Sequence, residues 1–406
     1  MRLHHLLAAA LLTPFASAQD PQPTEALETR IEQLEQQLEV VLEELADSTT
    51  TSNTSIGGSA DSGFSFGGYG EGHANFRQSS DRDYLDLHRF VFYLGYQFND
   101  WIQLSSETEI EHAYVDDDDG YLMIEQLHVD FSVAPAFNIR AGRHLVPVGI
   151  TNKIHEPNTF YSVERPSVEK YVIPSTWSQD GVGVYGRLND HVEYEIYVGG
   201  GMDGSGFNAT DGIRGGRLKE RPGTHEPAVT GRLDFYPMAG DPDHDLRIGA
   251  SFYTSGLDNA NQGTSSAPGR VTLVSADVQY RRGDFEARGV YAQGKIDDVE
   301  QLNAAFGEDV GEEQVGYYIE AAYHFMPDAW KTGRLDRANA VVFARFEDYD
   351  TQHEVPAGVT KDPDAAREEI TAGVAFFFTE ELVIKVDYSI RDEQDDLFNL
   401  GIGWSF

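Results

Sequence analysis

Apolar and polar side chains alternate one by one in a series of short segments that runs from Gly63 to the carboxy terminus. In the segment 102–111 every odd-numbered residue is polar, and three of these are Glu. The apolar residues Ile102, Leu104 and Ile110 are even-numbered. Because successive side chains of a β-strand point to opposite faces, this strand has one apolar face and one charged face. A strand buried in a soluble sheet would have to hide these carboxylates without partners. The pattern therefore predicts an all-β fold with lipid on one face and water on the other.

The same alternation recurs in about sixteen segments, an even number such as closed bacterial barrels have. The connections between the segments alternate in length, because short turns such as 99–100 and 189–190 are followed by long stretches such as 147–180. Outer-membrane barrels have short periplasmic turns on one rim and long extracellular loops on the other. Two turn-side connections, 237–245 and 326–337, are longer than this rule expects. We predict a transmembrane antiparallel β-barrel of about 16 strands.

The last strand ends on an aromatic carboxy-terminal residue, Phe406. Its apolar residues alternate with small or polar ones, and they are Phe398, Leu400, Ile402, Trp404 and Phe406. This pattern resembles the closing strand of bacterial outer-membrane barrels. We therefore expect the chain to reside in outer-membrane lipid and to be recognised by the barrel-assembly machinery through this strand.

The amino terminus has the features of a secretory signal peptide over 1–18. Arg2 precedes an apolar run, and the small residues Ala16, Ser17 and Ala18 form a cleavage site. The chain has no Cys, which excludes disulfides and a lipid anchor on cysteine. Beyond the signal peptide, no stretch of about eighteen apolar residues could form a membrane-spanning helix. Insertion into a membrane must therefore depend on strands.

Residues 19–47 are predicted to form a periplasmic coiled-coil helix. Apolar residues recur there in steps of four and three, and Glu and Gln fill most positions between them. These apolar residues are Leu27, Ile31, Leu34, Leu38, Val41 and Leu45. A lone surface helix with an apolar stripe is the other interpretation. Residues 48–62 are rich in Ser, Thr and Gly and are expected to be a linker to the barrel domain, 63–406.

This order of signal peptide, Glu/Gln-rich coiled coil, linker and barrel resembles the phosphate-selective porin O/P family. The stretch 139–188 contributes to the resemblance through Gly142-Arg143, Pro147, Gly149, Glu164-Arg165 and the segment 181–186. The resemblance implies a trimer of water-filled barrels with a long loop folded inward. It does not carry phosphate selectivity over, because the family's phosphate selectors use many Lys in the channel. The strands here offer scattered Arg opposed by carboxylates.

Charged residues on the polar faces of the strands are predicted to line the channel. They are Arg89, Glu107, Glu109, Glu111, Asp130, Arg140, His144, Arg187, Arg232, Arg247, Asp277, Arg288, Arg345 and Lys385. This mixture of signs either produces a transverse field that sets ion preference or forms neutralising pairs that brace the wall. A loop as long as 147–180 usually has a function. Its ionisable residues are predicted to form a constriction, namely Lys153, His155, Glu156, Glu164, Arg165, Glu169 and Lys170.

The net charge of -38 argues against a nucleic-acid partner, because a polyanion would be repelled. It fits either an acidic surface suited to salty surroundings or a cation preference at the channel mouths. Arg residues inside the barrel would favour anions instead. We therefore expect an outer-membrane porin that passes ions and small hydrophilic solutes with weak selectivity. The alternatives are an anion- or phosphate-selective porin and a structural tether between outer membrane and cell wall.

An enzyme is the rival class, because Ser106, Thr108 and His112 share the outward face of one strand. His112 is six residues from Ser106, roughly 20 Å along a strand, which is too far for it to activate the hydroxyl. No enzymatic activity, cofactor or metal site is predicted. His112 and an outward Glu125 are instead expected to meet across the 116–120 loop and form a polar contact between subunits.

Overall fold

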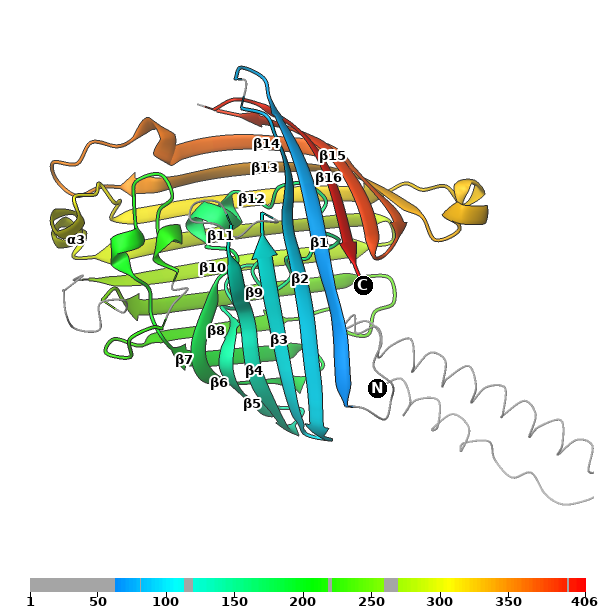
Figure 1. Ribbon diagram of the computed structural model, residues 1–406, viewed down its shortest axis with the longest axis horizontal. Helices are drawn as coiled ribbons and strands as arrows, with labels where there is room; N and C mark the ends of the chain where they lie inside the picture. Colours follow the sequence, from blue (N-terminus) through cyan, green and yellow to red (C-terminus); the bar gives the residue numbers. More distant parts are fainter. Residues whose placement is uncertain (1–62, 81, 113–119, 218–220, 259–268, 393) are drawn as a thin grey trace, which may run out of the picture. The chain divides into compact units, whose positions relative to one another are not determined.

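The computed structural model describes residues 63–80, 82–112, 120–217, 221–258, 269–392 and 394–406. The predicted signal peptide, coiled-coil helix and linker lie outside these residues and stay predictions. The described residues form sixteen antiparallel strands in one closed barrel (Figure 1). The strands are β1 (Phe64–Arg77), β2 (Tyr84–Asn99), β3 (Ile102–Glu111), β4 (Leu122–Ala134), β5 (Phe137–Leu145), β6 (Ser178–Asn189), β7 (Val192–Gly199), β8 (Ala228–Phe235), β9 (Asp245–Gly256), β10 (Arg270–Arg282), β11 (Phe285–Asp297), β12 (Glu313–His324), β13 (Asn339–Glu354), β14 (Ala366–Thr379), β15 (Leu382–Arg391) and β16 (Leu397–Ser405). The predicted fold class and strand number are confirmed.

Short helical segments occupy the connections between strands. They are η2 (Val168–Val172), η3 (Gly204–Gly206), η4 (Arg214–Gly216), α3 (Val299–Phe306), η5 (Asp328–Trp330), η6 (Gly333–Leu335) and η7 (Pro363–Ala365). Within the described part of the chain, no helix has the length and apolar character needed to cross a membrane.

The barrel closes where β1 pairs with β16. The carboxy-terminal residue takes part, because the backbone N–H of Gly68 donates to Phe406 O and that of Phe406 donates to Gly68 O, each at 2.9 Å. The ring of Phe406 lies 6.0 Å from that of Phe66 and 6.1 Å from that of Phe90. The last residue therefore completes both the hydrogen-bond ladder and the apolar outer face.

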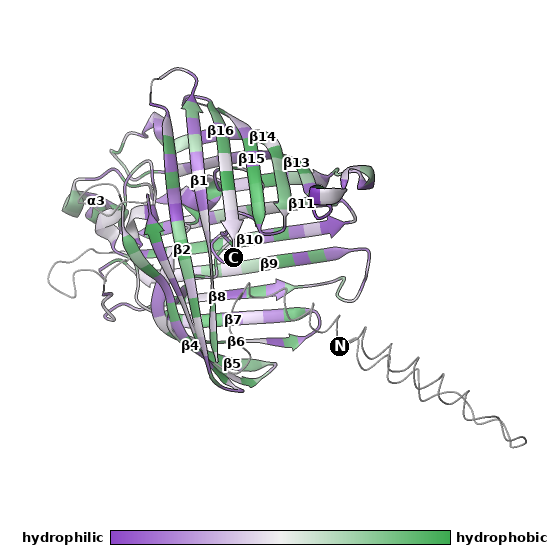
Figure 2. Cartoon of the chain, turned by 45° about the vertical axis from the view of Figure 1, so that its right-hand side comes forward, coloured by the Kyte–Doolittle hydropathy of each residue, from purple (hydrophilic) through white to green (hydrophobic). Residues whose placement is uncertain are grey.

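Apolar side chains cover the outside of the barrel. Residues such as Leu94, Ile196 and Ile319 are exposed, and the strands in Figure 2 are banded because residues of opposite hydropathy alternate along them. Their sequence neighbours on the other face include buried charges such as Glu195 and Glu320. This distribution is the reverse of a soluble protein and matches a barrel that lipid surrounds.

A β-bulge between β3 and β4 corrects the predicted orientation of Glu125. Glu107 pairs with Gln126, but the next residue, Thr108, pairs with Ile124, so Glu125 is the extra residue. A bulge lets two successive side chains point to the same face. Glu125 is fully buried inside the barrel, whereas the imidazole of His112 binds Asp86. The predicted outward contact between His112 and Glu125 is therefore wrong.

A hydrophobic core fills part of the barrel interior. Inward residues of consecutive strands β8 to β13, such as Tyr253 and Tyr318, pack against apolar residues of the β5–β6 connection, such as Trp177. The rings of Trp177 and Tyr253 are 4.5 Å apart. The connections that enter the barrel are thus fixed against one half of its wall.

Candidate functional site

The β5–β6 connection, residues 146–177, folds into the barrel and is called the inward loop here. It begins beside β5 but contacts β13, where Arg345 Nη1 donates to Ser162 Oγ at 2.6 Å. β5 and β13 are eight places apart in the sixteen-strand order, which places them on opposite sides of the barrel. The inward loop also reaches β15, because the backbone N–H of Val163 donates to Asp387 Oδ2 at 2.6 Å. The inward loop therefore crosses the lumen from wall to wall.

Cationic side chains of the wall hold the backbone of the inward loop. Each of four wall cations donates to one loop carbonyl: Arg89 to His155 at 2.9 Å, Arg232 to Gly149 at 2.7 Å, Arg288 to Thr159 at 3.3 Å and Lys385 to Ser162 at 2.9 Å. All four cations were predicted to line the channel. Hydrogen bonds from charged groups contribute about 1.5–3 kcal/mol each. The loop is therefore fixed at several points along its length.

Wall carboxylates form ion pairs with the wall arginines, and one of them also accepts a hydrogen bond from the loop. Arg232 Nη2 lies 2.7 Å from Asp234 and 2.9 Å from Asp277. Glu347 binds Arg345 at 2.6 Å and accepts from the backbone N–H of Val168 at 3.1 Å. Of the two interpretations of the mixed wall, these contacts favour the pairs that brace the structure.

All fourteen predicted lining residues lie at inward positions of their strands, but nine of them are buried. The buried ones are Arg89, Glu107, Glu109, Asp130, His144, Arg232, Asp277, Arg345 and Lys385. Glu111, Arg140, Arg247 and Arg288 are partly exposed, and Arg187 is exposed beside a turn, where it binds Glu193 at 2.7 Å. A role in permeation stays a prediction for each of these residues.

The predicted constriction residues all lie on the inward loop, but each makes different contacts. Glu169 is buried and accepts from Thr151 Oγ1 at 2.7 Å and from Tyr318 OH at 2.8 Å, which ties the loop to itself and to β12. Four of the other six contact wall strands: Lys153 binds Glu195, His155 lies 3.3 Å from Glu125, Glu156 accepts from Tyr93 OH at 3.1 Å, and Glu164 accepts from Asn75 at 3.0 Å. The remaining two contact the loop itself. Arg165 donates to Thr176 Oγ1 at 2.8 Å, and Lys170 Nζ lies 5.3 Å from the ring centroid of Tyr171.

Two of the predicted constriction residues, Glu164 and His155, have shifted pKa values. Burial raises the pKa of the Glu164 carboxyl, but His73, whose Nδ1 is 3.3 Å away, outweighs burial and holds that pKa well below its usual range. Burial lowers the pKa of His155, but the Glu125 and Glu107 carboxylates outweigh it and raise the pKa to about 10. Both residues are therefore in their charged forms at neutral pH in the absence of other ligands.

A hollow of about 530 Å³, called the outer vestibule here, lies on the side of the long connections. Seven basic residues line it: Arg77, Arg82, Arg165, Lys170, Arg345, Arg367 and Arg391. Four acidic residues oppose them: Glu164, Asp364, Glu369 and Asp395. Tyr171 stacks on Tyr349 in this region, with ring centroids 5.5 Å apart, and Arg367 lies 5.5 Å from its ring. The vestibule is therefore locally basic, although the chain as a whole is strongly acidic.

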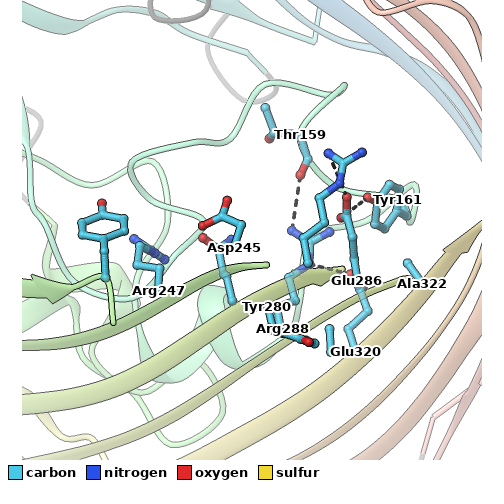
Figure 3. Close-up of a pocket in the computed structure, with 13 residues that line it drawn as sticks. Thr159, Tyr161, Asp245, Arg247, Tyr280, Glu286, Arg288, Glu320 and Ala322 are labelled. Carbon is cyan, nitrogen blue, oxygen red and sulfur yellow. Dashed lines mark hydrogen bonds and ion pairs between the residues drawn. The ribbon is translucent and has the colours of Figure 1, made fainter. Parts of the chain in front are cut away.

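A second hollow of about 370 Å³ lies on the side of the short turns and is shown in Figure 3. Thr159 and Tyr161 of the inward loop face Arg247, Arg288 and other wall residues across it. Three basic and three acidic residues line it: Arg247, Arg281, Arg288, Asp245, Glu286 and Glu320. This hollow is balanced in charge.

The β7–β8 connection also enters the barrel. The sequence did not predict this second inward connection. Residues 200–217 place Met202, Phe207 and Ile213 in the hydrophobic core, and Arg217 Nη1 donates to the carbonyl of Thr176 at 3.2 Å. Burial lowers the pKa of Arg217 to about 10. Only these isolated apolar residues in a Gly-rich segment could have indicated it.

Solved structures that share this fold include outer-membrane proteins and porins. They include OmpF of Salmonella typhi in complex with daunomycin, with a TM-score of 0.55, 13% identity and coverage of 84% of this chain and 97% of that one. In-vitro folded OmpT, an outer membrane protein of Vibrio cholerae, has a TM-score of 0.53 and 10% identity over 87% of this chain and 100% of that one. An anion-selective porin from Comamonas acidovorans has a TM-score of 0.52 and 12% identity over 85% and 100%. At these identities, the similarity shows a shared porin fold.

No protein-family model matches the chain, so membership of the phosphate-selective O/P family is not confirmed. An uncharacterized protein of Aquifex aeolicus (strain VF5) is 30% identical over 365 residues, which is 85% of this chain and 80% of that protein. The chain belongs to the same family as this Aquifex aeolicus protein.

Proposed function

We propose that this protein is an outer-membrane porin, a water-filled channel through which ions and small hydrophilic solutes diffuse passively. The observation that carries the proposal is a closed sixteen-strand barrel, apolar outside, whose inward loop crosses the lumen with a polar hollow on each side. A barrel of this size is too wide for wall side chains alone to fill. The inward loop supplies the narrowing that such a barrel needs to sort solutes by size.

The anchoring of the inward loop supports a constriction of fixed size. Its backbone is held by wall cations on β2, β8, β11 and β15, and each of these cations is buried or partly buried. A loop held from several directions has few alternative positions. We therefore infer a permanently open channel of modest width.

The outer vestibule supports a weak preference for anions as the second candidate. Its seven basic residues outnumber its four acidic ones, and a field is screened within about 8 Å at physiological salt, so local residues outweigh the total charge. The seven basic residues are distributed over strands and loops, which fits general attraction of anions better than a dedicated phosphate site.

We propose a homotrimer in the outer membrane, with the coiled-coil helix 19–47 in the periplasm. The support is an outward polar patch on β3, β5 and β6. Arg143 Nε lies 2.6 Å from Asp180 on the outer surface, and Ser106 shares the same row of paired residues. Charged groups on a lipid-facing surface are unfavourable, and a neighbouring subunit would shield them.

The test is single-channel recording of the purified full-length protein in planar bilayers. We expect discrete conductance steps, and the absence of steps from heat-modifiable, folded protein would refute the porin proposal. Reversal potentials in a potassium chloride gradient then measure selectivity. Lys170→Gln with Arg391→Gln should shift the reversal potential toward cations, whereas Arg187→Gln at the turn side should not. Strong block by submillimolar phosphate would instead support a phosphate-selective channel.

A further inference from the structure

A cluster of ionisable side chains lies where the inward loop meets β3 and β4. His155 Nε2 of the loop is 3.3 Å from Glu125 Oε1 and 3.8 Å from Glu107 Oε1. One ligand atom from each of the three residues lies within 4.8 Å of the others, and all three side chains are at most 3% exposed. The β-bulge described above turns Glu125 toward this point, so the local backbone assembles the cluster.

Neighbouring groups orient two of these side chains. His155 Nδ1 lies 3.0 Å from the carbonyl of Asn152, and the N–H that donates to this carbonyl leaves Nε2 directed at the carboxylates. Gln126 Nε2 donates to Glu107 Oε2 at 2.6 Å, and Tyr69 OH donates to Oε1 at 3.4 Å, where a second lone pair is left for the cluster. Supporting hydrogen bonds of this kind are typical of metal-binding imidazoles and carboxylates.

The third side chain lacks such support. Among the described residues, neither carboxylate oxygen of Glu125 forms a hydrogen bond, and neither does His155 Nε2; they contact each other only as an ion pair. Leaving a buried carboxylate without hydrogen bonds is costly. Glu125 is 0% exposed and directed into the cluster. A buried carboxylate that points at an imidazole without a hydrogen-bond donor of its own is the arrangement expected of a metal ligand.

The charge around the cluster also has the sign that a cation would neutralise. Four buried carboxylates, Glu71, Glu107, Glu109 and Glu125, lie around three buried basic side chains, Arg89, His73 and His155. A proton on His155 Nε2 is the alternative occupant, but with that proton in place the carboxylates still outnumber the cations. A divalent ion would remove more of the excess negative charge.

We propose that Glu107, Glu125 and His155 form a binding site for a divalent transition-metal ion of the Zn²⁺ type. One imidazole and two carboxylates are a donor set that Zn²⁺ accepts, with one position left for water. Metal–ligand bonds of about 2.1 Å in a tetrahedron place ligand atoms about 3.4 Å apart, close to the 3.3 Å and 3.8 Å that separate His155 Nε2 from the two carboxylates. The ion would tie the inward loop to β3 and β4 and thereby fix one edge of the lumen. The site does not depend on the chain being a channel.

A second cluster supplies a matched control. Asp86, His88 and His112 also bring ligand atoms within 4.8 Å, but both imidazoles already bind Asp86 Oδ2, at 3.1 Å and 2.8 Å, and the group is partly exposed. It differs from the proposed site by having its carboxylate already hydrogen-bonded.

The experiment measures Zn²⁺ binding by calorimetry on folded full-length protein stripped with a chelator. The wild type and the His88→Ala/His112→Ala double variant should each bind one tight equivalent, and Zn²⁺ should raise their unfolding temperatures. In Glu125→Gln, binding should weaken by more than about tenfold, because even changes to residues that only support the metal ligands cost about 10- to 100-fold. Heat-modifiability on gels verifies that each variant is folded, and His155→Gln replaces Glu125→Gln if that variant fails to fold.

Unchanged Zn²⁺ binding in the Glu125 or His155 variant would overturn the proposal, as would loss of the tight equivalent in the His88/His112 variant. Absence of tight Zn²⁺ binding to the wild type would show that a proton occupies the cluster. Equal affinity for Mg²⁺ would contradict a transition-metal site. The metal-site proposal is tested by Zn²⁺ affinity and not by conductance. Its failure can therefore be distinguished from a failure of the porin proposal.

Discussion

At the scale of single residues, many charged side chains inside this barrel are buried in ion pairs. Arg232 is typical, because its guanidinium binds Asp234, Asp277 and the carbonyl of Gly149 at once. Removing one member of such a group leaves uncompensated buried charge, which is much more costly than losing an exposed ion pair.

Replacing Arg232 by Met should therefore lower the free energy of unfolding by about 3–5 kcal/mol. Arg187→Met removes an exposed ion pair with Glu193 and should cost less than about 1 kcal/mol. Urea titration of the folded barrel, followed by the heat-dependent gel shift, measures both. Similar losses in the two variants would contradict the structural role of Arg232.

The lowered pKa of Glu164 predicts a dependence of stability on acid. A carboxyl whose folded pKa lies below its unfolded value of about 4.3 stabilises the fold above that value. That contribution is lost as the pH falls from there toward the folded pKa. Between pH 5 and pH 3 the wild type should lose more stability than Glu164→Gln. The side chain is 36% exposed, so water screens part of the effect. Parallel acid-unfolding curves for the two proteins would contradict this assignment.

At the scale of elements, the inward loop and the wall form one unit. The loop turns at Gly149, where φ is +73°, and a Cβ at this position would lie 2.4 Å from Glu169 Oε1. Glu169 is the carboxylate that ties the loop to β12. Gly283, in the β10–β11 turn, also has a positive φ of 54°, but a Cβ there would meet nothing within 4 Å.

These two glycines allow a controlled test of the loop anchor. Gly283→Ala should cost only the backbone strain of a left-handed residue, about 1–2 kcal/mol. Gly149→Ala should cost clearly more and should release the loop, which limited proteolysis within 146–177 would detect as faster cleavage. Equal cleavage rates in the two variants would indicate that Glu169 does not set the position of the loop.

At the scale of the whole molecule, the barrel wall differs around its circumference. Strands β8 to β13 carry the hydrophobic core on their inner side, whereas β3, β5 and β6 carry the polar patch on their outer side. The hydrophobic core lies inside the barrel against the inward loop, whereas the polar patch lies on the outer surface. The two features therefore contact different partners. We assign the outer patch to contacts between subunits of the proposed trimer.

Arg143→Leu combined with Asp180→Leu should lower the dissociation temperature of the oligomer on gels while the barrel itself stays folded. The reason is that the pair would lie in the shielded contact and its loss would remove polar interactions between subunits. His112→Leu is the control, because His112 lies beyond the end of β3 and outside the row that contains Arg143 and Asp180. An unchanged oligomer in the double variant would place the contact elsewhere on the barrel.

The alternation along the chain was enough to predict the all-β fold and the strand number, but it placed Glu125 on the wrong face. These features are predictable because lipid outside and polar groups inside require apolar and polar side chains to alternate along every strand. That rule is local, and the pattern of β3 or β16 can be recognised without knowing its partners. It also identified the long β5–β6 connection and its ionisable residues, because length and composition are visible in the chain.

The contacts of the inward side chains could not be predicted, because they depend on how distant parts of the chain come together in the barrel. Lys385 and Ser162 are far apart in sequence, and nothing in a period of two distinguishes a wall charge that faces water from one that binds a loop. One extra residue at the β3–β4 bulge reversed the side on which Glu125 lies, since a shift of one residue exchanges the faces of a strand. The cluster with His155 depends on that bulge and on a loop from another part of the chain. It therefore exists only in the folded barrel.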